Sequence, residues 1–577
     1  MDDDVENMYG ASRFNFGGWY PSVTTIAPTP PVDAPTPVED APPVEDAPPV
    51  EDAPPVEDAP PVEDAPPVED APPVEDASSL NTTIDGSSLT IESLNLFGRD
   101  PSIKLQLDLT HIENARKSLL SFGKDNRTYG LNTGVGNNAD IPLDGDDVTL
   151  FQKNLVRSHA VGVGDALDLQ ATRRMMILRL NVLAKGYSGI SVESAMHLLN
   201  AINVGFYPRI PLKGTVGASG DLAPLSHMVL GLIGEGLAWD DESETYIDAK
   251  TVLEEKELEI LELQAKDGLA LINGTQFMMA LAVDNYARVS RLVEVADLAA
   301  ALTIAGTNGT NRAFEACVHE ARPHAGQGVS AANLRKYLPV DTAYGQTQDP
   351  YSFRCTPQIH GPTRDTLAFV RGVLNVEINS ATDNPMVFAD REEVISGGNF
   401  HGQYVAMAMD ILGLSVSELG SVSERRNAFL ISEPHKGIDG VTQLPEFLTN
   451  DNGLNNGFMI TQYTAASLVS ENKVLCHPSC VDSIPTSNGK EDHVSMGGFS
   501  ARKCRNILDN VEYILALELM TAAQAMWFHK ETLKELPHLN ALYDKIRDKV
   551  DPLEGDRYMG DDIQAMVDMV KSGDILD

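Results

Sequence analysis

Apolar residues recur every three or four positions over long stretches of this chain. The clearest case lies between residues 402 and 430, where the apolar positions are Val405, Ala408, Met409, Leu412, Val416 and Leu419. Because an α-helix turns once in about 3.6 residues, this spacing places all of them on one face. The same periodicity predicts helices at 146–160, 171–185, 222–237, 287–305 and 505–527.

Alternation of apolar and polar residues, which is typical of a half-buried strand, is scarce. The best candidate strand lies near 245–262. We therefore predict an all-α fold, an elongated bundle of long helices with a loop-rich N-terminal region and with the polar motifs on loops. Several predicted helices have broad apolar faces, which also indicates burial against other subunits.

Composition separates the first part of the chain from this helical body. Residues 34–77 consist almost wholly of Ala, Pro, Val, Glu and Asp, and six copies of Ala-Pro-Pro-Val-Glu-Asp run from Ala41 to Asp76. Two prolines per repeat remove hydrogen-bond donors and fix φ, so the repeats favour an extended spacer without a core. We predict a disordered acidic tail over residues 1–77 and a globular, catalytic region over 78–577.

Charge and cysteine usage exclude several classes of partner. Residues 1–77 hold 19 acidic residues and one basic residue, Arg13, and so carry −18 of the net charge of −41. An acidic chain argues against nucleic acid or an anionic membrane as partner. Five scattered cysteines and the absence of a secretory signal indicate the cytoplasm. Cys476 and Cys480 resemble half of a zinc site, but no second pair follows, and we predict no metal.

Three small residues, Ala218-Ser219-Gly220, carry an unusual chemical possibility. If the Gly220 nitrogen attacks the Ala218 carbonyl carbon, a five-membered ring closes with loss of water. Loss of a second water from Ser219 then gives an exocyclic methylene group, an electrophile. A glycine tolerates the strained backbone that this attack requires. Asp221 either assists ring formation or caps the following helix.

Two further loops bear candidate functional residues. Tyr129 opens a loop rich in Gly, Asn and Thr, and taken alone such a residue is more often a structural tyrosine. Tyr351 and Arg354 are three residues apart, so on a helix both face one way, and Arg354 could bind a carboxylate bidentately. The alternative interpretation of Arg354 is a solvated or salt-bridged residue.

Taken together, these motifs resemble the aromatic amino acid ammonia-lyase family over residues 88–572. The matching segments, in family order, are 129–134 (YGLNTG), 214–225 (GTVGASGDLAPL), 268–276 (GLALINGTQ), 348–355 (QDPYSFRC), 379–385 (NSATDNP) and 396–402 (SGGNFHG). The resemblance implies a 4-methylidene-imidazol-5-one (MIO) group formed from Ala218-Ser219-Gly220, with no diffusible cofactor. It also implies a homotetramer whose active sites combine residues from three chains.

The family pattern assigns roles to individual residues. By resemblance, the catalytic residues are Tyr129, Ser219, Tyr351 and Glu491. The substrate-binding residues are His159, Asn273, Gln348, Arg354, Phe400 and Glu491. Tyr129 is the expected base for the substrate's β-proton, and this role requires a depressed pKa.

Two polar positions indicate the substrate. Ser158-His159 and Glu491 resemble the histidine-specific branch, whereas the phenylalanine and tyrosine branches carry other residues there. Buried polar groups of this kind would be left unpaired by a phenyl ring. The resemblance therefore implies L-histidine as substrate, with trans-urocanate and ammonia as products. Val135 and Gln403 depart from the usual residues of that branch.

Other functions remain open at this point. A tyrosine or phenylalanine lyase, or a 2,3-aminomutase that re-adds ammonia, fits the same motifs. A different class of function is a catalytically silent scaffold whose acidic tail binds a basic partner. The products formed from each amino acid discriminate among these alternatives.

Overall fold

The computed structural model describes residues 81–339, 348–432 and 444–576. These residues belong to one compact unit, Glu75–Asp577. The predicted acidic tail, residues 1–77, lies outside the described residues.

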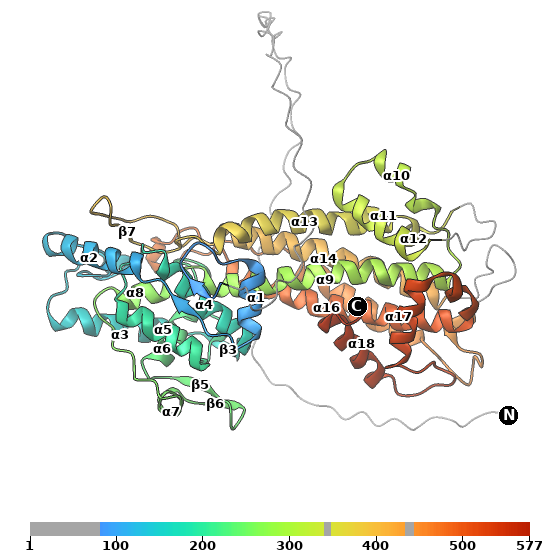
Figure 1. The fold of residues 1–577 in the computed structure, drawn as a ribbon, viewed down its shortest axis with the longest axis horizontal. Coiled ribbons are helices and arrows are strands. Elements are labelled where there is room, and N and C mark those ends of the chain that lie inside the picture. Colours follow the sequence, from blue (N-terminus) through green and yellow to red (C-terminus); the bar gives the residue numbers. More distant parts are fainter. Residues whose placement is uncertain (1–80, 340–347, 433–443, 577) are drawn as a thin grey trace, which may run out of the picture. The chain divides into compact units, whose positions relative to one another are not determined.

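Long helices that contact one another form the centre of this unit (Figure 1). They are α9 (Gln276–Gly306), α13 (Thr356–Glu377), α14 (Gln403–Leu430), α15 (Met459–Leu475) and α16 (Gly497–Phe528). The sequence favours these helices because their apolar residues keep the helical period. In α16, for example, Ile507, Val511 and Ile514 are all buried.

Two glycines of α14 allow a close approach to α16. A Cβ atom built on Gly413 would lie 3.0 Å from the side chain of Ile507. One built on Gly420 would lie 3.1 Å from Ile514 and 3.2 Å from Val511. These contacts are tighter than ordinary packing, so larger residues at the two positions would separate the helices.

Shorter helices and strand pairs surround these helices. The remaining α-helices are α1 (Ile91–Arg99), α2 (Thr110–Asp125), α3 (Asp146–His159), α4 (Leu169–Ala184), α5 (Val192–Val204), α6 (Leu222–Leu232), α7 (Ala249–Glu255), α8 (Asp267–Ile272), α10 (Ala316–Glu320), α11 (Ala325–Tyr337), α12 (Tyr351–Arg354), α17 (Pro537–Arg547) and α18 (Gly560–Ser572). Within the described ranges, each strand pairs with one other strand, so every sheet has two strands. The pairs are β1 (Thr83–Ile84) with β2 (Gln106–Leu107), β3 (Val163–Ala166) with β4 (Pro211–Lys213), β5 (Leu237–Asp240) with β6 (Thr245–Asp248), and β7 (Met386–Phe388) with β8 (Glu393–Ile395).

The all-α prediction is confirmed, and the predicted helices are present with shifted ends. The helix expected over 222–237 ends at Leu232, because Gly234 and Gly236 both adopt positive φ. The strand expected over 245–262 is wrong beyond Asp248. There the Asp248 side chain accepts hydrogen bonds from the Lys250 and Thr251 amides and begins α7 instead.

One helix in the described part of the chain, α14, is long and apolar enough to cross a membrane by length and composition. Of the most apolar 18-residue stretch of this helix, 67% is buried inside the protein. It packs against α9, α13 and α16, so it is a core helix of the bundle.

Candidate functional site

The loop with Ala218, Ser219 and Gly220 is held against a second loop at Gly274. Gly220 has φ of 70°, and a Cβ atom built on it would lie 2.1 Å from the Gly274 carbonyl oxygen. That carbonyl accepts a hydrogen bond of 2.6 Å from the Asp221 amide. No residue other than glycine fits position 220 in this conformation. The structure therefore presents the tripeptide as a tight, glycine-dependent turn at the start of α6.

Asp221 lies directly after the tripeptide and is fully buried. Asp221 is the N-cap residue of α6, as the capping interpretation placed it, but its side chain makes no capping hydrogen bond to the helix. Instead the carboxylate accepts a hydrogen bond of 2.9 Å from the Met278 amide and one of 3.4 Å from the Thr215 hydroxyl. Burial raises the pKa of Asp221 to about 7. A carboxyl group that titrates near neutral pH can take up or release a proton, and this one belongs to the residue that directly follows the tripeptide.

A cavity of about 420 Å³ opens at Ser219. Five predicted site residues line it, from segments far apart in the sequence: Tyr129, His159, Ser219, Asn273 and Glu491. The rest of the lining is mixed. Apolar side chains come from Val135, Phe151, Leu155, Leu222, Leu269 and Ile272, and Gly136, Asn138, Asn154, Ser158 and Ser487 also line the cavity. A concave pocket with apolar walls and convergent polar groups is typical of a small-molecule site.

Glu491 faces Ser219 across this cavity. The Ser219 hydroxyl donates to Glu491 Oε1 at 3.4 Å. The other carboxylate oxygen, Oε2, accepts a hydrogen bond of 2.6 Å from the Thr486 hydroxyl. Oε1 of Glu491 thus points to Ser219, and Oε2 is held by Thr486.

His159, the last residue of α3, has a defined tautomer. Its Nδ1 lies 2.8 Å from the Leu155 carbonyl oxygen, which can only accept, so Nδ1 carries the proton. Burial lowers the pKa of His159, while the Leu155 carbonyl and the Glu491 carboxylate oppose the change. The ring is therefore neutral near pH 7, and its Nε2 is an acceptor.

Tyr129 contacts the backbone of its own loop. The Gly136 amide donates a hydrogen bond of 2.7 Å to the Tyr129 hydroxyl oxygen. Burial raises the pKa of Tyr129, the nearby Glu491 carboxylate adds to the rise, and the Gly136 bond opposes it. The expectation of a depressed pKa is therefore wrong in this structure, because desolvation and a like charge disfavour the phenolate.

Asn273 follows α8 and is fixed through its backbone. Its carbonyl oxygen accepts a hydrogen bond of 2.6 Å from Arg179, whose guanidinium also pairs with Asp383 at 3.2 Å. The side-chain oxygen of Asn273 is buried and has no partner within the described residues. Because a buried unpaired acceptor is costly, this oxygen is well suited to accept a hydrogen bond from an N–H or O–H group of a ligand.

Four predicted residues do not line the cavity: Gln348, Tyr351, Arg354 and Phe400. Tyr351 and Arg354 do face one way, as their spacing predicted, and the guanidinium lies 4.6 Å from the Tyr351 ring centre. Tyr351 is 70% exposed. Figure 1 places α12, which bears both residues, at the other end of the long helices from α3 and α8. Within one chain, therefore, Tyr351 and Arg354 are remote from Ser219.

The residues that hold the site were not predicted from the sequence. They are Thr486 against Glu491, Gly136 against Tyr129, and Arg179 against Asn273. Thr486 and Gly136 lie in the same loops as the residues they hold, whereas Arg179 is distant in sequence from Asn273. In all three cases the bond depends on the folded geometry, and the residue type alone gives no signal for it. In the described ranges, no group of three metal-binding side chains is assembled.

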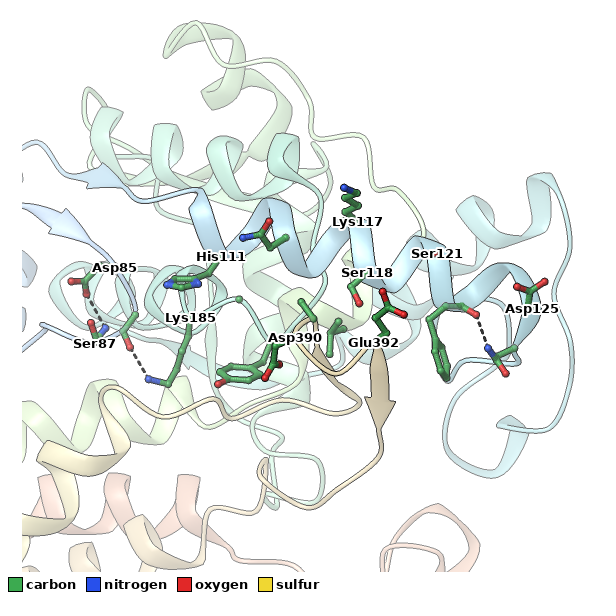
Figure 2. Close-up of a pocket in the computed structure, with 18 residues that line it drawn as sticks. Asp85, Ser87, His111, Lys117, Ser118, Ser121, Asp125, Lys185, Asp390 and Glu392 are labelled. Atoms are coloured by element: carbon green, nitrogen blue, oxygen red, sulfur yellow. Dashed lines mark hydrogen bonds between the residues drawn. The ribbon is translucent and has the colours of Figure 1, made fainter.

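A larger cavity of about 960 Å³ lies elsewhere, between α2 and the β7–β8 hairpin. Figure 2 shows His111, Lys117, Ser118, Ser121 and Asp125 along α2, opposite Asp390 and Glu392. Its lining is polar and of mixed charge, and none of the predicted site residues belongs to it. The smaller cavity is the candidate site because it joins Ser219 of the tripeptide to the predicted polar groups.

Comparisons with known proteins agree with this geometry. Residues 89–548 match the aromatic amino acid lyase family. A histidine ammonia-lyase of Caenorhabditis elegans is 45% identical over 505 residues, which cover 85% of this chain and 73% of the relative. The crystal structure of a histidine ammonia-lyase from Trypanosoma cruzi matches with a TM-score of 0.78 and 41% identity, over 85% of this chain and 94% of that one. A tyrosine aminomutase from Streptomyces globisporus matches with a TM-score of 0.79 and 35% identity, over 86% and 98%.

Proposed function

The chain belongs to the aromatic amino acid lyase family, and on this premise we propose that it deaminates L-histidine without oxidation to trans-urocanate and ammonia. It is a carbon–nitrogen lyase. The observation that carries the choice of substrate is the presence of His159 and Glu491, two hydrogen-bond acceptors, in the cavity that contains Ser219.

Ala218, Ser219 and Gly220 are the source of the electrophile. The residues fit an MIO group, because position 220 accepts only glycine and Ser219, the source of the methylidene carbon, lines the cavity. Once formed, this group supplies an electrophilic methylidene carbon for the substrate's amine. Asp221, with its pKa raised to about 7, can exchange a proton with the Gly220 nitrogen during ring closure.

The imidazole side chain is recognised by acceptors. Neutral His159 presents Nε2, and Glu491 presents Oε1. A neutral imidazole ring offers one N–H donor to such groups and a protonated ring offers two, whereas a phenyl ring offers none. Each buried acceptor left unpaired would cost about 1–3 kcal/mol, so the site discriminates against phenylalanine.

In this proposal Tyr129, which lines the cavity with Ser219, takes the β-proton of the substrate. The Gly136 amide stabilises its phenolate by a hydrogen bond. Apolar walls from Phe151, Leu155 and Leu269 limit access of water to this proton. Because burial raises the pKa of Tyr129, proton removal is favoured at alkaline pH.

The substrate carboxylate is held by Arg354 of another subunit. Arg354 and Tyr351 are remote from Ser219 in one chain, so a site that contains all three requires association. We accordingly propose a homotetramer with shared sites. An exposed apolar stripe on α14 supports association: its residues are Tyr404, Met407, Ile411 and Leu414.

Incubation with individual amino acids tests the function. L-Histidine should give trans-urocanate, detected by its ultraviolet absorbance, at a rate well above that of coumarate from tyrosine or cinnamate from phenylalanine. Similarity to a tyrosine aminomutase makes a β-amino acid the second candidate product. A β-amino acid as sole product would show that the protein is an aminomutase.

Ser219→Ala tests the electrophile separately from the substrate. The wild-type chain should be lighter than its sequence by two water molecules in an intact mass spectrum. Ser219→Ala cannot form the methylidene group, so turnover should fall by several orders of magnitude. A variant with full activity would rule out the electrophile.

A further inference from the structure

The loop that contains Glu491 is closed at its base by Thr486. The Thr486 amide donates to the Glu491 carbonyl oxygen at 3.0 Å, and the Glu491 amide donates back at 3.3 Å. Between them, Ser487, Asn488 and Gly489 have φ of 51°, 54° and 78°. Residues other than glycine seldom adopt this conformation, and they do so mainly where surrounding contacts enforce it.

The Thr486 side chain adds a third bond, to the functional group itself. Its hydroxyl donates to Glu491 Oε2 at 2.6 Å, and both residues are half-buried. A short bond from a hydroxyl to a carboxylate is among the stronger protein hydrogen bonds. With Oε2 engaged, Oε1 is the oxygen that points to Ser219, at 3.4 Å from its hydroxyl.

The same loop packs against the Tyr129 side of the cavity. A Cβ atom built on Gly136 would lie 3.4 Å from the Ser487 hydroxyl oxygen, and the Gly136 amide binds the Tyr129 hydroxyl. The 3₁₀ turns Gly136–Asn138 and Ser487–Gly489 are in contact. The loop therefore has little freedom to move as a body, and the remaining freedom of Glu491 is rotation of its side chain.

We propose that Thr486 is a positioning residue for Glu491, which orients one carboxylate oxygen toward a nitrogen of the bound imidazole substrate. This inference rests on the proposed histidine chemistry. Thr486 touches no substrate itself. It acts by removing the side-chain rotations of Glu491 that would turn both oxygens away from the cavity.

Thr486→Val and Thr486→Ser form a matched pair. Valine keeps the shape but lacks the hydroxyl, whereas serine keeps the hydroxyl. We expect Thr486→Val to lower kcat/KM for L-histidine roughly ten-fold or more, and Thr486→Ser to stay within about two-fold of wild type. Both variants should show the loss of two water molecules by intact mass.

The affinity for trans-urocanate, measured by calorimetry, distinguishes positioning from a general structural role. Thr486→Val should weaken product binding in the wild-type background but not in a Glu491→Ala background, where no carboxylate remains to be oriented. Equal weakening in both backgrounds, an unchanged kcat/KM in Thr486→Val, or failure of that variant to lose two waters would overturn the proposal. If the wild type itself makes no urocanate, the proposed function fails instead.

Discussion

Neighbouring groups have opposite effects on the pKa of the Tyr129 hydroxyl. The Gly136 amide favours its phenolate, while burial and the Glu491 carboxylate favour the protonated form, and the balance raises the pKa. Because the base must be deprotonated, kcat/KM for L-histidine should rise with pH from neutral into the alkaline range. Tyr129→Phe should remove this rise and lower kcat/KM by about two to four orders of magnitude.

A profile of kcat/KM against pH for both proteins provides the measurement. His159 does not produce the rise, because its pKa is lowered from an ordinary value near 6.5 and its ring is already neutral. Asp221, whose pKa is raised to about 7, is proposed to act during ring closure, before the first turnover. The loss of two water molecules in an intact mass spectrum therefore reports on Asp221, and the pH profile of kcat/KM reports on Tyr129. A Tyr129→Phe variant that kept the alkaline rise would assign the base to another residue.

At the residue scale, the sequence predicted which residues line the site better than it predicted their protonation. Tyr129, His159, Ser219, Asn273 and Glu491 were predicted, and all five line one cavity. The pKa direction of Tyr129 was wrong, because it depends on burial and on the Glu491 charge. Neither quantity can be obtained from a linear motif.

At the element scale, the packing of α14 on α16 depends on a missing side chain. Gly420 is buried, and its nearest neighbours are Ile514 and Val511 at 3.1 Å and 3.2 Å from a built Cβ. Gly420→Leu should therefore lower the free energy of unfolding by about 1–3 kcal/mol through overpacking. Thermal or denaturant unfolding followed by circular dichroism gives the value.

Gly372 of α13 is the matched control. It is exposed, and a Cβ built on it would meet nothing within 4 Å. Gly372→Leu should leave stability unchanged or raise it, because leucine favours a helix over glycine by about 0.5–1 kcal/mol. Equal losses at the two positions would show that helix contact does not explain the glycine at 420.

The ends of elements were the least predictable part of the fold. The periodicity of apolar residues locates α14 well, since a long buried helix repeats its signal over many turns. It placed the start of α9 near residue 287, whereas α9 begins at Gln276. There the helix is buried on nearly every side, so the contrast between apolar and polar faces disappears.

At the scale of the whole molecule, one chain separates residues that the proposed reaction requires together. Ser219 lines the cavity near α3 and α8, and Arg354 lies on α12 at the other end of the long helices.

Ser219→Ala and Arg354→Ala should each be inactive alone. If a site combines Ser219 of one subunit with Arg354 of another, co-expression should restore activity. Random mixing of equal amounts leaves both residues intact in about a quarter of such sites, because each is intact with a probability of about one half. If both residues came from one chain, every site would carry a defect and the mixture would stay inactive. Urocanate formation by the co-purified assembly, compared with a mixture of the separately purified variants, decides between the two arrangements.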